Sequence, residues 1–167
     1  MIRRAEGRGQ APRAGAPLLL AMLLAGTVSI SALAAKPAGL LDGFRQAQLI
    51  IETAASRCLL LDIYLADSRE QHSQGLMFVE HLDEFEGMLF RYRRPARLTM
   101  WMKNTYIPLD MIFVDPSGAI AGIAKQTRPL STDRIYSPES VTGVLEVNGG
   151  FTDRWQVSDG NRLLLIE

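Results

Sequence analysis

The residues best suited to chemistry lie in two stretches of this 167-residue chain. They are Trp101, Lys103, Asn104, Thr105, Asp110 and Glu146. If the carboxyl groups of Asp110 and Glu146 approached each other, one would be pushed toward protonation, and the pair would provide a general acid and a general base. A tryptophan next to a lysine and two short polar residues suits another task, which is to stack against a sugar or planar ligand and hydrogen-bond its rim.

The position of Trp101 follows from a strand pattern. Between Arg97 and Lys103 apolar and polar residues alternate, and alternate side chains of a strand face opposite sides. The apolar members are Leu98, Met100 and Met102. Trp101 is therefore expected on the polar face, where an uncovered ring would serve as a ligand platform or an interface anchor. Alternatively, the irregular segment 126–140 folds over the ring and makes it ordinary core.

Asp110 stands near the start of an apolar strand, Leu109–Val114, that is expected to be covered on both faces. A buried carboxylate needs hydrogen-bond donors, and the backbone and side chains of Asn104 and Thr105 are the nearest candidates in the sequence. We therefore expect Asp110 to tie this loop to the sheet. The alternative is an acid, a base or a ligand contact in a cleft at the loop.

Glu146 alternates with apolar neighbours in a predicted strand, Val141–Asn148, so its side chain points to one face of the sheet. A structural ion pair with Lys103 or Arg97 is the favoured interpretation. An approach to Asp110 would instead create the acid and base pair.

Other kinds of site find little support in the sequence. Met100 and Met102 would suit Cu(I), but their alternation places both on the apolar face, which favours packing. His72 and His81 are too isolated to indicate a metal site, and solvent exposure is the default for both. The sequence contains no Ser/His/Asp set, phosphate-binding glycine loop or cysteine cluster. We therefore expect neither a metal nor a cofactor.

Residues 1–35 are predicted to be a cleavable signal peptide. Arginines stand at positions 3, 4, 8 and 13, an apolar run covers 18–30, and residues 32–34 have the small-x-small pattern that signal peptidase accepts. The apolar run is shorter than the roughly 20 residues that a membrane span needs. We expect a periplasmic or secreted protein that keeps no membrane span after cleavage.

The chain that remains has about 132 residues, enough for one domain with its own core. Residues 36–47 show little periodicity and are predicted to be a flexible tether, and 48–167 to be a single globular domain. A net charge near −3 gives this part no electrostatic footprint for nucleic acid. Cys58 is the single cysteine, and we expect it to be a small buried residue without a disulfide.

The periodicity predicts an α+β fold that is mainly β, a small mixed β-barrel or sandwich-like domain with two short helices. One helix is expected at 67–75, where Ser68 and Gln71 can form a capping box, and the other at 151–157. The strands are expected at 48–53, 57–66, 87–92, 97–103, 109–114, 119–125, 141–148 and 162–166.

Several short motifs follow one another between Gly75 and Gly160. They are Gly75-Leu76-Met77, Gly87-Met88-Leu89-Phe90, Trp101-Met102-Lys103-Asn104-Thr105, Pro108-Leu109-Asp110, Phe113-Val114-Asp115, Leu145-Glu146 and Gly160. With these motifs the chain, from about Ile51 to Glu167, resembles the domain-of-unknown-function 192 family, also called uncharacterised protein family 0127. The resemblance implies a compact, mainly β domain that is often exported and has no established activity.

Three positions depart from the family's pattern. Val79 stands where the family usually has arginine, Met100 where it usually has phenylalanine, and Asn161 where it usually has aspartate. The first departure argues against an anionic ligand bound by that arginine, and the last against a role for a carboxylate there.

The function that these observations favour is a binding module for a small polar ligand or a cell-envelope component. Its site would be the polar face and loop at 101–105, with Asp110 and Glu146 as further ligand contacts. Two alternatives stay open. One is a hydrolase or lyase-type enzyme that uses Asp110 and Glu146, and the other is a structural partner in an envelope complex that uses Trp101 as its anchor.

Export is testable directly. Expressed with its own amino-terminal segment, the protein is expected to accumulate outside the cytoplasm, shortened by 34 or 35 residues because the small-x-small pattern ends there. Intact mass spectrometry of the cell fractions measures this. A membrane fraction that holds the uncleaved 167-residue chain would contradict the prediction.

Overall fold

An antiparallel pair of long strands, β1 (Arg45–Glu52) and β2 (Cys58–Ala66), begins the fold. The apolar face predicted for β2 is buried, because successive side chains of a strand point to opposite sides. Cys58 and Leu60 belong to the other face and are exposed. The buried role predicted for Cys58 is therefore wrong.

The computed structural model describes residues 39–54 and 56–166. The predicted signal peptide and the first residues of the predicted tether lie outside the described residues. The described part of the tether belongs to the folded domain, because Leu41 and Phe44 are buried and β1 already begins at Arg45.

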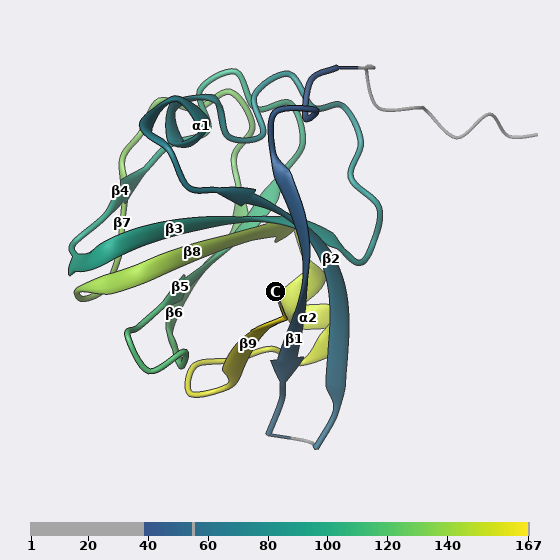
Figure 1. Ribbon diagram of the computed structural model, residues 1–167, viewed down its shortest axis with the longest axis vertical. Helices are drawn as coiled ribbons and strands as arrows, with labels where there is room; N and C mark the ends of the chain where they lie inside the picture. Colours follow the sequence, from purple (N-terminus) through teal and green to yellow (C-terminus); the bar gives the residue numbers. More distant parts are fainter. Residues whose placement is uncertain (1–38, 55, 167) are drawn as a thin grey trace, which may run out of the picture. The chain divides into compact units, whose positions relative to one another are not determined.

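A seven-stranded mixed sheet forms the framework, in the order β6-β5-β8-β3-β2-β1-β9. Within this sheet β2 and β3 run parallel, and the other neighbouring strands are antiparallel. The sheet curls into a half-barrel, and a small second sheet of β4 and β7 lies beside it (Figure 1). The further strands are β3 (Glu86–Ala96), β4 (Thr99–Met100), β5 (Leu109–Val114), β6 (Ile120–Thr127), β7 (Ile135–Tyr136), β8 (Val141–Asn148) and β9 (Arg162–Ile166). The predicted mainly β, α+β class with two short helices is confirmed.

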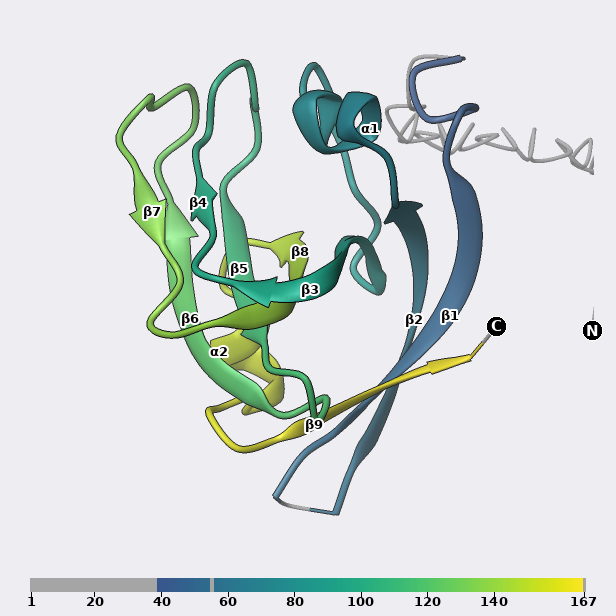
Figure 2. The ribbon, with the colours of Figure 1, turned by 60° about the vertical axis from the view of Figure 1, so that its left-hand side comes forward.

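The curl brings the last strand back to the opposite edge of the sheet. The backbone N–H of Ile120 donates to the carbonyl of Asn161 at 2.8 Å, and that of Leu163 donates to Gly118 at 2.8 Å. Figure 2 shows β9 starting beside the turn that joins β5 to β6 and running across to β1. These bonds satisfy backbone groups that an open edge would leave unpaired.

Both predicted helices are present. In α1 (Arg69–Gln74) the Ser68 hydroxyl accepts from the Gln71 backbone while the Gln71 side chain accepts from the Ser68 backbone, which is the predicted capping box. The second helix, α2 (Phe151–Trp155), follows Gly150, whose φ of 85° favours glycine. Neither helix of the described residues has the length and apolar character that a membrane crossing requires.

The sheet has a core on each of its two faces. The α1-side core includes Leu76, Met88, Phe90, Met100, Met102, Met111 and Val144. The α2-side core includes Leu61, Ile63, Ile112, Leu145, Val147, Phe151 and Val157. Neighbouring residues of β8, Val144 and Leu145, thus belong to different cores, as the alternation of a fully covered strand requires.

The strand predicted at 97–103 is where the observed strands differ most from the prediction. The alternation is as predicted, with Leu98, Met100 and Met102 buried, but only Thr99–Met100 pairs as a strand. Its partner is β7, a short strand within the segment 126–140 that was expected to be irregular. Backbone bonds outside strand pairing hold the rest of this region, among them that from Met102 N–H to Ser131 at 3.0 Å.

Candidate functional site

A cavity of about 380 Å³ opens on the α1 side of the sheet. Its walls come from α1 and the turn after it, from β3, from β4 and the loop that follows, and from β8. Four of the predicted site residues line it, and these are Trp101, Lys103, Thr105 and Glu146. The cavity therefore brings together parts of the two stretches that the sequence singled out.

Glu146 lies among apolar residues of the α1-side core. It is opposite Met88 of β3 and Met111 of β5, and its side chain is only 4% exposed. Among the described residues none donates a hydrogen bond or a positive charge to its carboxyl group, so the predicted ion pair with Lys103 or Arg97 is not formed. Burial raises the pKa of Glu146 to about 8, which keeps the group neutral at pH 7.

Two aromatic side chains lie close to this carboxyl. The half-buried Tyr92 has a raised pKa, because burial, and after it the charge of Glu146, disfavours the phenolate. The ring of His72 packs 4.5 Å from that of Tyr92, between ring centroids. His72 Nε2 lies 2.8 Å from the carbonyl oxygen of Ala66, and because a carbonyl only accepts, Nε2 is the donor. The cavity wall thus contains packed aromatic rings, those of His72 and Tyr92.

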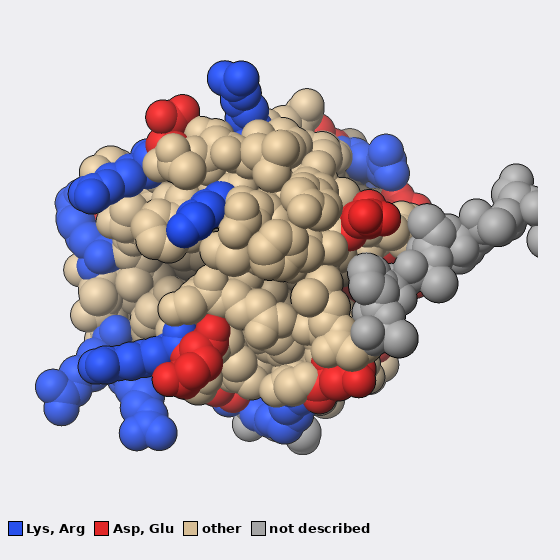
Figure 3. Space-filling model, turned by 90° about the horizontal axis from the view of Figure 1, so that it is seen from above, with Lys and Arg blue, Asp and Glu red and all other residues tan. Residues whose placement is uncertain are grey.

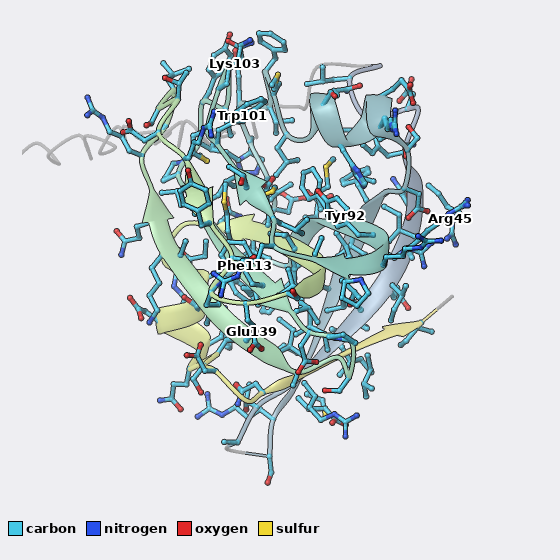
Figure 4. The ribbon with its side chains drawn as sticks, turned by 90° about the vertical axis from the view of Figure 1, so that its left-hand side faces the viewer. Arg45, Tyr92, Trp101, Lys103, Phe113 and Glu139 are labelled. Carbon is cyan, nitrogen blue, oxygen red and sulfur yellow. The ribbon has the colours of Figure 1, made fainter. Side chains whose placement is uncertain are left out.

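Trp101 and Lys103 lie at the mouth of the cavity. The Trp101 side chain is 50% exposed, so the segment 126–140 does not fold over it and the alternative that made it core is wrong. Figure 4 shows Trp101 and Lys103 at the loop end of the domain, with Tyr92 deeper on β3. Arg69 of α1 also lines the cavity, and it is exposed like Lys103.

Asn104 and Thr105 hold the loop rather than face solvent. The Asn104 carbonyl accepts from Phe78 N–H at 2.8 Å, and the Asn104 side-chain amide lies 3.7 Å from the Met77 sulfur. Thr105 is buried, and its carbonyl accepts from Leu130 N–H at 3.0 Å. Asn104 therefore fixes the loop that carries Trp101 and Lys103 to the turn after α1, and Thr105 fixes it to the segment 126–140.

Asp110 is fully buried and has four hydrogen-bond donors. Its Oδ1 accepts from the backbone of Gln126 at 2.7 Å and of Gly150 at 3.0 Å. Its Oδ2 accepts from the backbone and the hydroxyl of Thr152, at 2.9 and 2.7 Å. The structural role expected for Asp110 is present, but the donors come from β6 and α2 and not from Asn104 and Thr105.

The two carboxyl groups point to opposite faces of the sheet. Asp110 pairs with Val147, and Glu146, the next residue along β8, pairs with Met111. Cross-strand partners share a face and chain neighbours do not, so Asp110 faces the α2 side and Glu146 the α1 side. The acid and base pair that the enzyme alternative needs is therefore not formed.

Three titratable residues of the wall were not predicted as site residues, and these are Arg69, His72 and Tyr92. A weak signal existed, since Arg69 and His72 are three apart on the predicted helix and so share a face. Nothing in the sequence indicates that this face lies over Tyr92. Among the described residues no group of His, Cys, Asp and Glu has the arrangement of a metal site.

The three residues that depart from the family's pattern have structural roles. Val79 and Met100 are both buried in the α1-side core. Asn161 Oδ1 accepts from Ser158 N–H at 3.1 Å and closes the turn before β9. Met102 is packed as predicted, with its sulfur 3.1 Å from the Thr127 hydroxyl.

Fold and site together define a curled, mainly β domain with one buried carboxyl at the floor of an open cavity. Residues 50–165 match the DUF192 family, described as an uncharacterized ACR, and the chain belongs to that family. The resemblance found in the sequence is thereby confirmed. Curated proteins give no match.

Two solved structures are similar over most of their length. One, from Sinorhizobium meliloti 1021, is named as a candidate transcription regulator; it is 38% identical with a TM-score of 0.72, and the alignment covers 73% of this chain and 95% of that one. The other, a protein of unknown function from Novosphingobium aromaticivorans DSM 12444, is 29% identical with a TM-score of 0.72, covering 78% and 93%.

Replacement of Asp110 by asparagine is expected to destabilise the fold. One carboxylate oxygen becomes an amide NH2 group, which cannot accept from the two donors that now meet that oxygen, so we expect the free energy of unfolding to fall by on the order of 1 to 3 kcal/mol. Urea denaturation measures this, with the exposed Asp159→Asn as control. Equal stability of Asp110→Asn and the parent would contradict the structural role.

Replacement of Glu146 by glutamine is expected to change how stability depends on pH. Unfolded, Glu146 has its ordinary pKa of 4.5, and folded about 8, so between these values the unfolded chain holds fewer protons. The stability that this pKa difference gives to the folded state is therefore fully present below pH 4.5 and is lost by pH 8. Between these values the free energy of unfolding falls by up to about 1.4 kcal/mol per pH unit.

The measurement is the free energy of unfolding from pH 4 to 9, for the parent and for Glu146→Gln. The variant is expected to match the parent near pH 4.5 and to become the more stable protein by pH 8, because its side chain stays neutral. The exposed Glu139→Gln is the control and should follow the parent. Parallel curves for Glu146→Gln and the parent would rule out the raised pKa.

Proposed function

We propose that this protein is a binding module for a small polar ligand, held in the cavity between Glu146 and Trp101. One observation carries the proposal, which is a buried carboxyl group that lines a cavity and receives no hydrogen bond from the described residues. Buried polar groups in folded proteins are usually paired, and leaving one unpaired costs about 1 to 3 kcal/mol. A ligand that donates to Glu146 would recover that free energy.

The size and lining of the cavity fit such a ligand. A volume of about 380 Å³ lies in the range of small-molecule sites, roughly 300 to 1,000 Å³. Apolar and aromatic side chains form much of the wall, and a few polar groups converge in it. This is the usual composition of a ligand pocket, in which apolar contact gives affinity and polar groups fix orientation.

The mouth supplies a stacking surface. Trp101 lines the cavity with a ring that is half exposed, so it can pack one face against a planar or sugar-like ligand. Uncharged side chains cover much of the end of the domain that carries α1, with most charges toward its edges (Figure 3). The loop at 101–105 is held firmly, which favours a site formed before the ligand arrives.

The place of action in this proposal is outside the cytoplasm, as the predicted signal peptide indicates, and the ligand is then a solute or a cell-envelope component. The regulator description of the Sinorhizobium protein does not extend to this chain in our proposal, because a net charge near −3 without the signal segment does not favour nucleic acid.

A second candidate function, a docking face for an envelope protein, rests on exposed aromatic side chains near the mouth. Phe78 and Tyr106 are both exposed and pack edge to face at 5.9 Å, and Trp101 is exposed nearby in the sequence. Aromatic anchors of this kind are enriched at protein interfaces. The unpaired Glu146 is not explained by such a partner, so the ligand module is the better account.

Truncation of Trp101 distinguishes a ring that stacks against a ligand from a ring that packs in the core. Trp101→Ala is expected to lower the free energy of unfolding by about 1 kcal/mol or less, since half of the side chain is already in water. In a thermal-shift screen against sugars, amino acids and other small metabolites, a ligand at a hundred times its Kd adds about 2.7 kcal/mol of stability. That shift should be lost in Trp101→Ala.

Tyr136→Ala is the matched control, because Tyr136 is also an exposed aromatic residue but does not line the cavity. It should keep the ligand-induced shift. A Trp101→Ala protein that is destabilised by the 3 to 5 kcal/mol of a core aromatic, or that binds the ligand as the parent does, would contradict the platform.

A further inference from the structure

The acidic and the basic residues that line the cavity differ in how far they are buried. One acidic residue, Glu146, lines the buried floor, and two basic residues, Arg69 and Lys103, line the exposed mouth from α1 and from the loop after β4. Neither basic side chain forms an ion pair with a described residue. The other titratable groups in the wall are His72 and Tyr92.

The floor is suited to a positively charged donor. A hydroxyl group would satisfy the Glu146 carboxyl with a hydrogen bond, but an ammonium group would add a charge pair at a buried carboxyl, where such interactions are stronger than in bulk water. The aromatic rings of Phe90 and Tyr92 lie in the same wall, and aromatic faces attract cations. A cation here would also favour the ionised form of Glu146.

Part of the cavity wall is apolar and adaptable. Leu76, Met77 and Met100 supply this part. Methionine side chains are unbranched and polarisable, so they adjust to ligands of irregular shape. A short aliphatic or planar segment would fill this part, and it would place a group of negative charge at the mouth, which Arg69 and Lys103 line.

We propose that the cavity binds a small zwitterion, with an ammonium group on Glu146, an apolar middle section, and a carboxylate or other anionic group between Arg69 and Lys103. This inference rests on the proposed function and specifies its ligand class. It assigns a separate role to each end of the ligand. The two ends can therefore be tested independently.

The test is calorimetric titration of the purified protein with straight-chain ω-amino acids of three to eight carbons. Each is compared with the carboxylic acid and the amine of the same length, and with glucose as a neutral sugar. At least one ω-amino acid is expected to bind tenfold or more tightly than its matched acid and amine. At pH 7 its binding should release protons from Glu146, so the heat should vary with the ionisation enthalpy of the buffer.

Two variants test the two ends of the ligand, and a third is the control. Glu146→Gln is expected to weaken the ω-amino acid and the amine tenfold or more and to abolish proton release, but to leave the acid unchanged. Lys103→Gln should weaken the ω-amino acid and the acid and leave the amine unchanged. Lys125→Gln is the control, because Lys125 is exposed and does not line the cavity, and it should bind as the parent does.

The outcomes distinguish the ligand class from the proposed function. Binding of glucose that depends on Glu146 and Trp101, without binding of any ω-amino acid, would overturn the zwitterion and leave the binding module in place. Zwitterion binding that is unchanged in Glu146→Gln would overturn the assignment of this cavity. If neither the ω-amino acids nor any compound of the metabolite screen binds, both proposals are rejected.

Discussion

The two-residue alternation of β8 is the constraint on which both fold and site depend. This strand pairs with β3 and β5, and it sends Leu145 and Val147 into the α2-side core and Val144 into the α1-side core. Glu146 must then point to the α1 side with Val144. A shift of the register by one residue would move the carboxyl to the other face but would also turn three apolar side chains out of their cores. The fold therefore holds Glu146 in a place where none of the described residues donates a hydrogen bond to its carboxyl group.

The two buried carboxyl groups show how differently one sheet can treat the same chemistry. Asp110 receives four hydrogen bonds, and these join β5 to the bend of β6 and to the start of α2. Glu146 lies one strand away on the opposite face and receives none from the described residues. An acceptor with four donors stabilises the fold, whereas an unpaired one at a cavity opposes it at neutral pH. This contrast separates a structural carboxyl from a candidate ligand contact.

Much of the fold follows from local patterns. The limits of β5, β8 and β9 agree with the prediction, because each is a short apolar run bounded by turn residues, and the capping box places α1. The exposure of Trp101 follows from alternation alone. Other features depend on packing between distant segments: the β4 and β7 pair, the helix face of His72 over Tyr92, and the donors to Asp110. Sequence neighbours pointed to Asn104 and Thr105 for that last role, and the tertiary fold supplies Thr152 instead.

The charge state of Glu146 in the folded protein is the most direct test of this account. It can be measured from the 13C chemical shift of the side-chain carboxyl, assigned by comparison with Glu146→Gln, in a titration of the ligand-free protein from pH 4 to 10. The account predicts a midpoint of about 8, since burial without a partner disfavours the carboxylate. A midpoint near the ordinary value of 4.5 would show that the group is solvated or paired, and would contradict the central claim.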